Sequence, residues 1–285
     1  MHFNHLIMKS SVTNLEKDII ISNKADLFMG HDYYKIDDLL DEEHKMARDA
    51  VRDWVKQEVS PIIEGYAQAA KCPVHLFKGL ANVGAFGPTI PTEYGGGGMD
   101  EIAYGLIMQE LERGDSGIRS MASVQGSLVM YPIYKFGSEE QRKKYLPGLG
   151  SGELIGCFGL TEPDHGSNPS GMLTRIREEG DYVILNGSKM WITNSPVADI
   201  AVVWAKDEKG IIRGVIVEKG MPGFSAPEIK GKWSLRASVT GELVFENVKV
   251  PKENILPNIQ GLKGPLSCLS KARYGIAWGA VGAEL

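Results

Sequence analysis

The spacing of apolar residues predicts a helical first half, a β-rich middle and a helical end. From residue 37 to about residue 70, apolar positions recur at steps of three and four between charged ones, which predicts an amphipathic helix. The same spacing predicts further helices at residues 74–83, 100–113, about 116–136 and 138–146. The first half of the chain is therefore expected to be helical.

The pattern changes from about residue 156, where short β-branched or aromatic runs follow one another. These runs cover residues 182–185, 190–193, 200–204, 211–217 and 242–248. Turn sequences separate them at residues 179–181, 186–187, 209–210 and 219–220. We expect a β domain of roughly 100 residues, folded as a small antiparallel barrel or sandwich.

These segments predict an α+β, multidomain chain in four parts. We expect an N-terminal tail at 1–33, a helical domain at 34–153, the middle β domain at 154–258, and the first helix of a C-terminal helical domain at 259–285. The last helix carries small and apolar residues at 277–281 and needs neighbours to pack against. We expect the chain to stop short of those neighbours.

A run of four glycines at residues 95–98 could be mistaken for a phosphate-binding loop. A dinucleotide fingerprint requires a strand before it and a helix after it within a βαβ unit, whereas both flanks here predict helices. We therefore interpret this run as a turn between helices.

Composition and charge exclude several classes of partner. The 285 residues are 43% hydrophobic and 24% charged, as in ordinary globular proteins. The net charge of −5 argues against a surface for polyanions, so nucleic acid is not an expected partner. No run approaches the roughly 20 apolar residues that span a bilayer. We expect neither nucleic-acid binding nor a membrane span.

The cysteines and the first residues favour a reducing compartment and no metal site. Three scattered cysteines, Cys72, Cys157 and Cys268, fit neither a disulfide framework nor paired metal ligands. The first 30 residues contain acidic side chains and lack the Arg-rich character of a transit peptide. His2 and His5 alone do not form a closed ligand set. A bacterial cytoplasm is favoured, with the mitochondrial matrix as the eukaryotic alternative.

Three motifs carry a resemblance to a known family. They are CFGLTEPDHGS at residues 157–167, LNGSKMWITN at 185–194 and RAS at 236–238. With the order of helical, β and helical segments, they resemble the acyl-CoA dehydrogenase family from about Tyr34 to the last residue. Each motif alone would be weak, and together they are specific.

The resemblance implies an FAD bound along the β domain. An isoalloxazine ring needs one apolar face covered and its polar edge supplied with hydrogen-bond donors. The implied cofactor contacts are Phe158, Gly159, Leu160, Thr161, Ser167, Trp191, Ile192 and Thr193. Trp191 would cover the ring, whereas without the resemblance it would be interpreted as strand core. Glu162 is predicted to satisfy local backbone donors rather than to act as a catalytic acid.

Residues 115–125 resemble the glutaryl-CoA dehydrogenase version of the family, in which an Arg-Ser pair contacts the distal carboxylate of the substrate. Here that pair is Arg119 and Ser120. A buried guanidinium needs an anion or several acceptors. Without the resemblance, Arg119 would be a surface residue or would pair with a nearby acid. The candidate acids are Glu110, Glu112 and Asp115.

The resemblance also assigns the acyl-CoA channel. Ser167, Leu266 and Arg273 would contact the substrate. Leu266 and residues 270–271 depart from the usual glutaryl-CoA dehydrogenase pattern, where an aromatic residue and a pair of amides are expected. The details of the channel therefore stay open.

The family reaction requires a glutamate that removes the α-proton of the thioester while the flavin takes a hydride from the β-carbon. In glutaryl-CoA dehydrogenases, loss of CO2 then gives crotonyl-CoA. Most relatives place this glutamate beyond the point where this chain stops, and a minority place it where Ala272 stands here. Glu284, one residue from the end, is not assigned the role. No catalytic residue is predicted within the chain.

The resemblance implies partners as well as chemistry. Glutaryl-CoA is the favoured substrate, in lysine and tryptophan degradation, and other short acyl-CoA thioesters are the alternative. The implied electron acceptor is an electron-transferring flavoprotein, and full-length relatives form homotetramers. A fragment that binds flavin or acyl-CoA without turnover, or a relic that does not fold stably, remains the rival interpretation.

Overall fold

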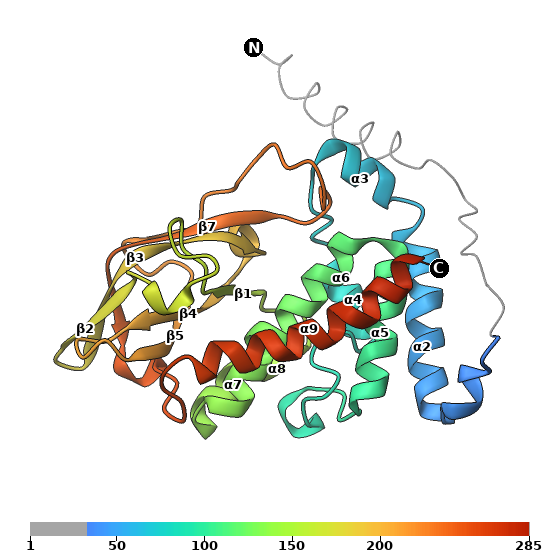
Figure 1. Cartoon of the computed structure of the whole chain (residues 1–285), viewed down its shortest axis with the longest axis horizontal. Helices are drawn as coiled ribbons and strands as arrows, with labels where there is room; N and C mark the ends of the chain where they lie inside the picture. The colour runs from blue at the N-terminus through green and yellow to red at the C-terminus, as the bar shows by residue number, and fades with distance from the viewer. Residues whose placement is uncertain (1–32, 285) are drawn as a thin grey trace, which may run out of the picture.

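The computed structural model describes residues 33–284, which form a helical part, a curled sheet and one long C-terminal helix. Figure 1 shows this last helix, α9, crossing from the sheet over the helical part. The helical elements are η1 (Ile36–Leu39), α2 (Glu42–Trp54), η2 (Val55–Val59), α3 (Ile63–Ala69), α4 (Leu76–Asn82), η3 (Thr92–Tyr94), α5 (Glu101–Gly114), α6 (Ser116–Ser123), η4 (Val124–Met130), α7 (Tyr131–Phe136), α8 (Glu139–Gly150) and α9 (Lys263–Glu284). The predicted arrangement of helices, sheet and helix is confirmed. The expected tail before residue 33, with His2 and His5, lies outside the described residues.

The prediction of one helix over residues 37–70 is wrong. The segment is divided into η1, α2, the π-helical η2 and α3, with a turn at residues 60–62 between the last two. Pro61 explains the turn, because proline lacks the backbone N–H and its ring clashes with the preceding helical turn. The apolar spacing resumes beyond the proline and made the two helices look like one.

The predicted helix over residues 116–136 is confirmed as one continuous helical run, made of α6, η4 and α7. Asp115 caps its N-terminus: the Asp115 side chain accepts hydrogen bonds from the amides of Gly117, at 2.7 Å, and Ile118, at 3.1 Å. Its centre, η4, is π-helical. Such wide turns are frequent at functional sites.

The middle of the chain is a seven-stranded sheet. Its strands are β1 (Gly156–Gly159), β2 (Arg175–Glu179), β3 (Tyr182–Thr193), β4 (Ile200–Lys206), β5 (Ile212–Glu218), β6 (Phe224–Ser225) and β7 (Thr240–Pro251). The short helices η5 (Pro169–Gly171) and η6 (Ser195–Val197) lie between strands, and η7 (Lys252–Asn254) follows β7. The order is β1-β4-β2-β3-β7-β6, and β5 pairs with β4. Most pairs are antiparallel as predicted, but β1 and β2 each pair with β4 in parallel.

The turn predicted at Asn186-Gly187 is wrong, because β3 continues through both residues. Leu185 pairs with Val248 and Gly187 with Phe245, so the extra residue of the bulge lies in β7. Gly187 has φ 138°, and a side chain there would come within 2.6 Å of Thr174. The glycine allows β3 to approach Thr174, the residue before β2, and does not form a hairpin turn.

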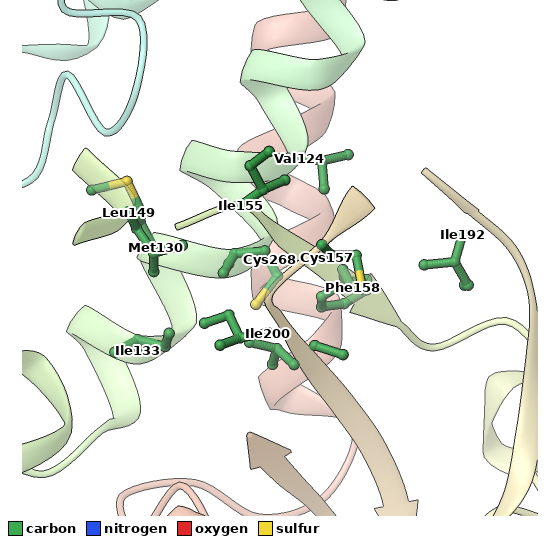
Figure 2. Close-up of a cluster of buried hydrophobic side chains, with 14 of the residues drawn as sticks. Val124, Met130, Ile133, Leu149, Ile155, Cys157, Phe158, Ile192, Ile200 and Cys268 are labelled. Atoms are coloured by element: carbon green, nitrogen blue, oxygen red, sulfur yellow. The ribbon is translucent and has the colours of Figure 1, made fainter. Parts of the chain in front are cut away.

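One apolar core joins the helices to the sheet. Figure 2 shows it where β1 passes between the helices, with Cys157 and Phe158 from β1 beside Val124 of η4 and Cys268 of α9. The buried amide of Gln125 fixes this junction: its Nε2 donates to the Leu149 and Leu154 carbonyls, and its Oε1 accepts from the Gly156 amide. The start of β1 is therefore tied to η4 and to the end of α8.

Candidate functional site

A cavity of about 370 Å³ lies where the end of β1, β3, η4 and α9 meet. Its lining is Val124, Leu128, Phe158, Leu160, Thr161, Gly166, Ser167, Pro169, Trp191, Ile192, Thr193, Leu266, Leu269 and Arg273. The structure thus brings together the predicted cofactor and channel residues except Gly159, Arg119 and Ser120. Most of this lining is apolar, and its polar side-chain groups are three hydroxyls, from Thr161, Ser167 and Thr193, and the guanidinium of Arg273.

Trp191 borders the cavity in an unusual backbone conformation. It lies in the second bulge of the β3–β7 pairing, where the extra residue is in β3 between Lys189 and Ile192, and it has φ 63°. A bulky side chain at positive φ is strained, and such strain is concentrated at binding and active sites. The side chain is 63% exposed, which is rare for tryptophan. The strand therefore holds a large aromatic surface open at the cavity.

The Leu160–Thr161 segment is tied to the same strand. The Met190 amide donates to the Thr161 carbonyl at 2.9 Å. Met190 directly precedes Trp191, and Thr161 directly follows Leu160. This bond sets the spacing between the two walls of the cavity.

Glu162 organises the loop that follows. It accepts hydrogen bonds from the backbone amides of Leu173, at 2.6 Å, and Thr174, at 2.9 Å, and from the ammonium of Lys189, at 2.9 Å. Its predicted role as an acceptor for backbone donors is confirmed, but the prediction that these donors are local is wrong, because they lie 11 and 12 residues further along the chain. Burial favours a raised pKa for Glu162, but these donors and the charge of Lys189 outweigh it and hold the pKa at about 2.

Lys189 was not found from the sequence. Its side chain is 0% exposed, whereas lysine is almost never fully buried unless it is paired. In an unbroken β3, the period of two places Lys189 on the same face as Val183 and Leu185, which are buried. The turn wrongly predicted at Asn186-Gly187 concealed that signal.

Helix α9 contributes one side of the cavity through Leu266, Leu269 and Arg273. Steps of three and four residues place these side chains on one face of the helix. Arg273 is the only ionisable side chain in the lining that the described residues provide, so this lining has no carboxylate. Ala272 is buried beside it.

Arg119 and Ser120 lie on α6 and are not among the residues that line the cavity. The Nε of Arg119 donates to the carboxylate of Glu112 on α5. A side chain at Gly279 of α9 would approach that carboxylate to 2.9 Å, so the ion pair lies among three helices. Pairing with a nearby acid, the alternative left open by the sequence, is the state of Arg119 in the structure.

The lining fits a flat, amphipathic ring system such as the flavin that the sequence resemblance implies. Phe158, Leu160, Trp191 and Ile192 offer apolar and aromatic surface, and the hydroxyls of the lining offer hydrogen bonds. By contrast, residues 33–284 contain no cluster of three His, Cys, Asp or Glu side chains suited to a metal ion. No helix within the same range is long and apolar enough to cross a membrane.

Two family models match the chain. One, described as acyl-CoA dehydrogenase, N-terminal domain, matches residues 41–153, and the other, described as acyl-CoA dehydrogenase, middle domain, matches residues 157–248. Together they account for well over half of the 285 residues.

Individual proteins are similar over most of the chain. A probable acyl-CoA dehydrogenase of Bacillus subtilis is 39% identical over 251 residues, which is 85% of this chain and 66% of the relative. The mitochondrial short-chain specific acyl-CoA dehydrogenase of Rattus norvegicus is 37% identical, over 85% of this chain and 60% of the relative. The crystal structure of a glutaryl-CoA dehydrogenase from Mycobacterium smegmatis in complex with FADH2 is 51% identical, with a TM-score of 0.85, over 87% of this chain and 64% of that one. The chain thus spans slightly less than two thirds of the length of these proteins.

Proposed function

Because this chain belongs to the acyl-CoA dehydrogenase family, we propose that its cavity binds FAD and an acyl-CoA thioester and that the protein oxidises the acyl chain. Glutaryl-CoA is the favoured substrate, with crotonyl-CoA and CO2 as products. One observation carries the proposal: Phe158, Thr161, Trp191, Thr193 and Arg273, from three separate parts of the chain, line a single cavity.

The residues of this chain bind and orient the two ligands. When bound, the flavin supplies the hydride acceptor. Trp191 and Ile192 cover apolar ring surface, and the hydroxyls of Thr161 and Thr193 offer hydrogen bonds to its polar edge. The apolar wall excludes water from the reacting groups. Arg273, the cation of the lining, attracts the anionic acyl-CoA.

The preference for glutaryl-CoA rests on Arg119. A guanidinium has five N–H donors, and in the part of the chain that the structure describes only the Nε of Arg119 is bonded, to Glu112. The terminal nitrogens stay available for a second carboxylate, and the Ser120 hydroxyl, on the same helix, can add a further bond. A dicarboxylic acyl chain satisfies these donors, and a simple acyl chain does not.

Binding without turnover is the second candidate. It is favoured by the lining of the cavity in the described residues, which has no carboxylate to accept the α-proton. Ala272, beside Arg273, cannot serve as a base. In this case the described residues would bind FAD and acyl-CoA, and the carboxylate for catalysis would have to come from outside them.

Anaerobic addition of acyl-CoA to the flavin-loaded protein separates these candidates. Loss of the oxidised-flavin absorbance with glutaryl-CoA, and less with butyryl-CoA, supports the dehydrogenase and its preference. An equal loss of this absorbance with glutaryl-CoA and with butyryl-CoA refutes the preference for glutaryl-CoA. Bound flavin that stays oxidised favours binding without turnover, and a protein that binds no flavin overturns the proposal.

The electron acceptor of the proposed reaction is an electron-transferring flavoprotein. Family membership supports this assignment. Substrate-dependent reduction of a purified electron-transferring flavoprotein by the loaded protein is the expected result. Reduction of an artificial dye without reduction of the flavoprotein would contradict it.

A further inference from the structure

A buried ion pair behind the cavity has no place in the function proposed above. The ammonium of Lys189, on β3, donates to the Glu162 carboxylate at 2.9 Å and to the Leu160 carbonyl at 3.1 Å. The Lys189 side chain is 0% exposed and that of Glu162 is 4% exposed. Both charges are therefore removed from solvent directly behind the cavity wall.

The pair connects three segments that line the cavity. Lys189 stands two residues before Trp191 and is bonded to the carbonyl of Leu160. Glu162 is also bonded to the amides of Leu173 and Thr174, at the far end of the loop that contributes Gly166, Ser167 and Pro169 to the lining. A change at either charge thus reaches the strand and both ends of the loop.

The surroundings explain how the lysine fits and which charge acts on it. A side chain at Gly159 would lie 3.1 Å from the Lys189 Cγ and 2.9 Å from Leu243, so the glycine makes room for the lysine stem. β1 presents Gly159, β7 presents Leu243 opposite Lys189, and the loop after β1 presents Glu162 and the Leu160 carbonyl. Within the described chain, Glu162 is the charged group that faces the ammonium.

Stability alone does not account for such a pair. Taking two charges out of water is costly, and well-packed apolar residues of similar volume often replace a buried ion pair without loss of stability. What apolar residues cannot provide is the set of directed hydrogen bonds that joins Leu160, Leu173 and Thr174 to β3. The pair is therefore suited to fixing geometry.

We propose that the Lys189–Glu162 ion pair positions the 160–174 loop against the strand that bears Trp191 and thereby sets the flavin affinity of the cavity. This inference rests on the proposed function. Lys189 and Glu162 act through Leu160, Thr161 and Trp191 and are positioning residues.

The protonation of Lys189 gives a readout that differs from stability. Burial lowers the pKa of Lys189 to about 8, against the opposing bond and charge of Glu162. Above that pH the ammonium loses its proton and the directed bonds change, so flavin affinity is expected to fall. In the unfolded chain Lys189 keeps this proton up to a pKa of about 10.5. As the pH rises from about 8 to about 10.5, the contribution of Lys189 to the free energy of unfolding therefore increases. Affinity and stability move in opposite directions.

The test measures flavin affinity and thermal unfolding for Lys189→Met, Glu162→Gln and the double variant, with Lys252→Met as the control. Lys252 makes an exposed ion pair with Glu178 away from the cavity. Each single variant is expected to bind FAD at least about tenfold more weakly, because a tenfold change in affinity corresponds to the loss of about one charge-assisted hydrogen bond. The double variant is expected to regain thermal stability without regaining affinity. A folded double variant with wild-type affinity overturns the proposal, and so does a wild-type affinity that is constant across the pKa of Lys189.

A separate measurement covers the case in which the wild-type chain binds no FAD. That result would refute the cofactor of the proposed function, and hydrogen exchange on the flavin-free chain would then decide the positioning role. Lys189→Met, or Glu162→Gln if the first does not fold, is expected to speed exchange at the amides of Met190, Leu173 and Thr174, with no change in α5. Unchanged exchange at these amides overturns the inference.

Discussion

Replacing Glu162 by glutamine is expected to destabilise the fold at neutral pH and to have a much smaller effect in acid. The carboxylate accepts hydrogen bonds from Leu173, Thr174 and Lys189, and only the carboxylate brings a negative charge to the buried ammonium. Glutamine keeps one acceptor oxygen and removes the charge. The ammonium of Lys189 is then buried without a counter-ion.

The magnitude follows from the pKa of Glu162. Although burial favours a higher value, the hydrogen bonds and Lys189 lower this pKa from 4.5 to about 2, which corresponds to about 3 kcal/mol of unfolding free energy. Because the folded pKa lies below the unfolded one, this contribution is fully present above pH 4.5 and is lost as the pH falls through about 2. Removing one partner of a buried pair generally costs about 3–5 kcal/mol, which agrees.

Urea unfolding of the wild type and Glu162→Gln over a series of descending pH values is the assay. The difference in unfolding free energy is expected to be largest at neutral pH and to shrink as Glu162 becomes protonated. Glu178→Gln, which removes an exposed ion pair with Lys252, is the matched control and is expected to change little at any pH. A loss that is independent of pH, or no larger than that of the control, would refute the reasoning.

Three further substitutions test the fold and the site. Gly187→Ala is expected to destabilise the protein by about 1–3 kcal/mol in urea unfolding, because of backbone strain and a clash, whereas Gly166→Ala meets nothing within 4 Å and should be tolerated. Trp191→Ala should weaken FAD binding by about tenfold or more without lowering the melting temperature, and Trp233→Ala, 98% exposed and outside the cavity lining, should leave FAD binding unchanged. Arg119→Gln should reduce the affinity for glutaryl-CoA by about 10- to 100-fold and leave that for butyryl-CoA nearly unchanged, and an equal loss for both would remove Arg119 from substrate selection.

The helices could be predicted largely because local rules decide where they begin. Asp100 and Ser138 stand at the predicted starts of two helices, and in the structure their side chains accept hydrogen bonds from amides of the first turn. The error over residues 37–70 arose because apolar spacing records only which face of a helix is buried. It does not show that Pro61 turns the chain between two helices whose faces meet the same core.

The state of Arg119 could not be predicted because several anions were within reach along the sequence. Glu110, Glu112 and Asp115 were all candidates, and their roles depend on tertiary structure. Glu110 is bonded to Arg52 of α2, and Asp115 caps its own helix, which leaves Glu112 for Arg119. The pairing of one residue thus depended on a helix about 60 positions away in the chain.

Three departures from local sequence preferences fall on one stretch of β3, and their clustering is informative. Within residues 186–191, an Asn-Gly pair lies inside a strand, a lysine is fully buried, and a tryptophan has positive φ. Each breaks a local preference that holds in most of the chain. Folded sequences tolerate such conflicts mainly where function requires them. All three conflicts lie on the strand that carries Trp191, Ile192 and Thr193 into the cavity, which is where a binding site for a rigid, flat cofactor needs its wall held in place.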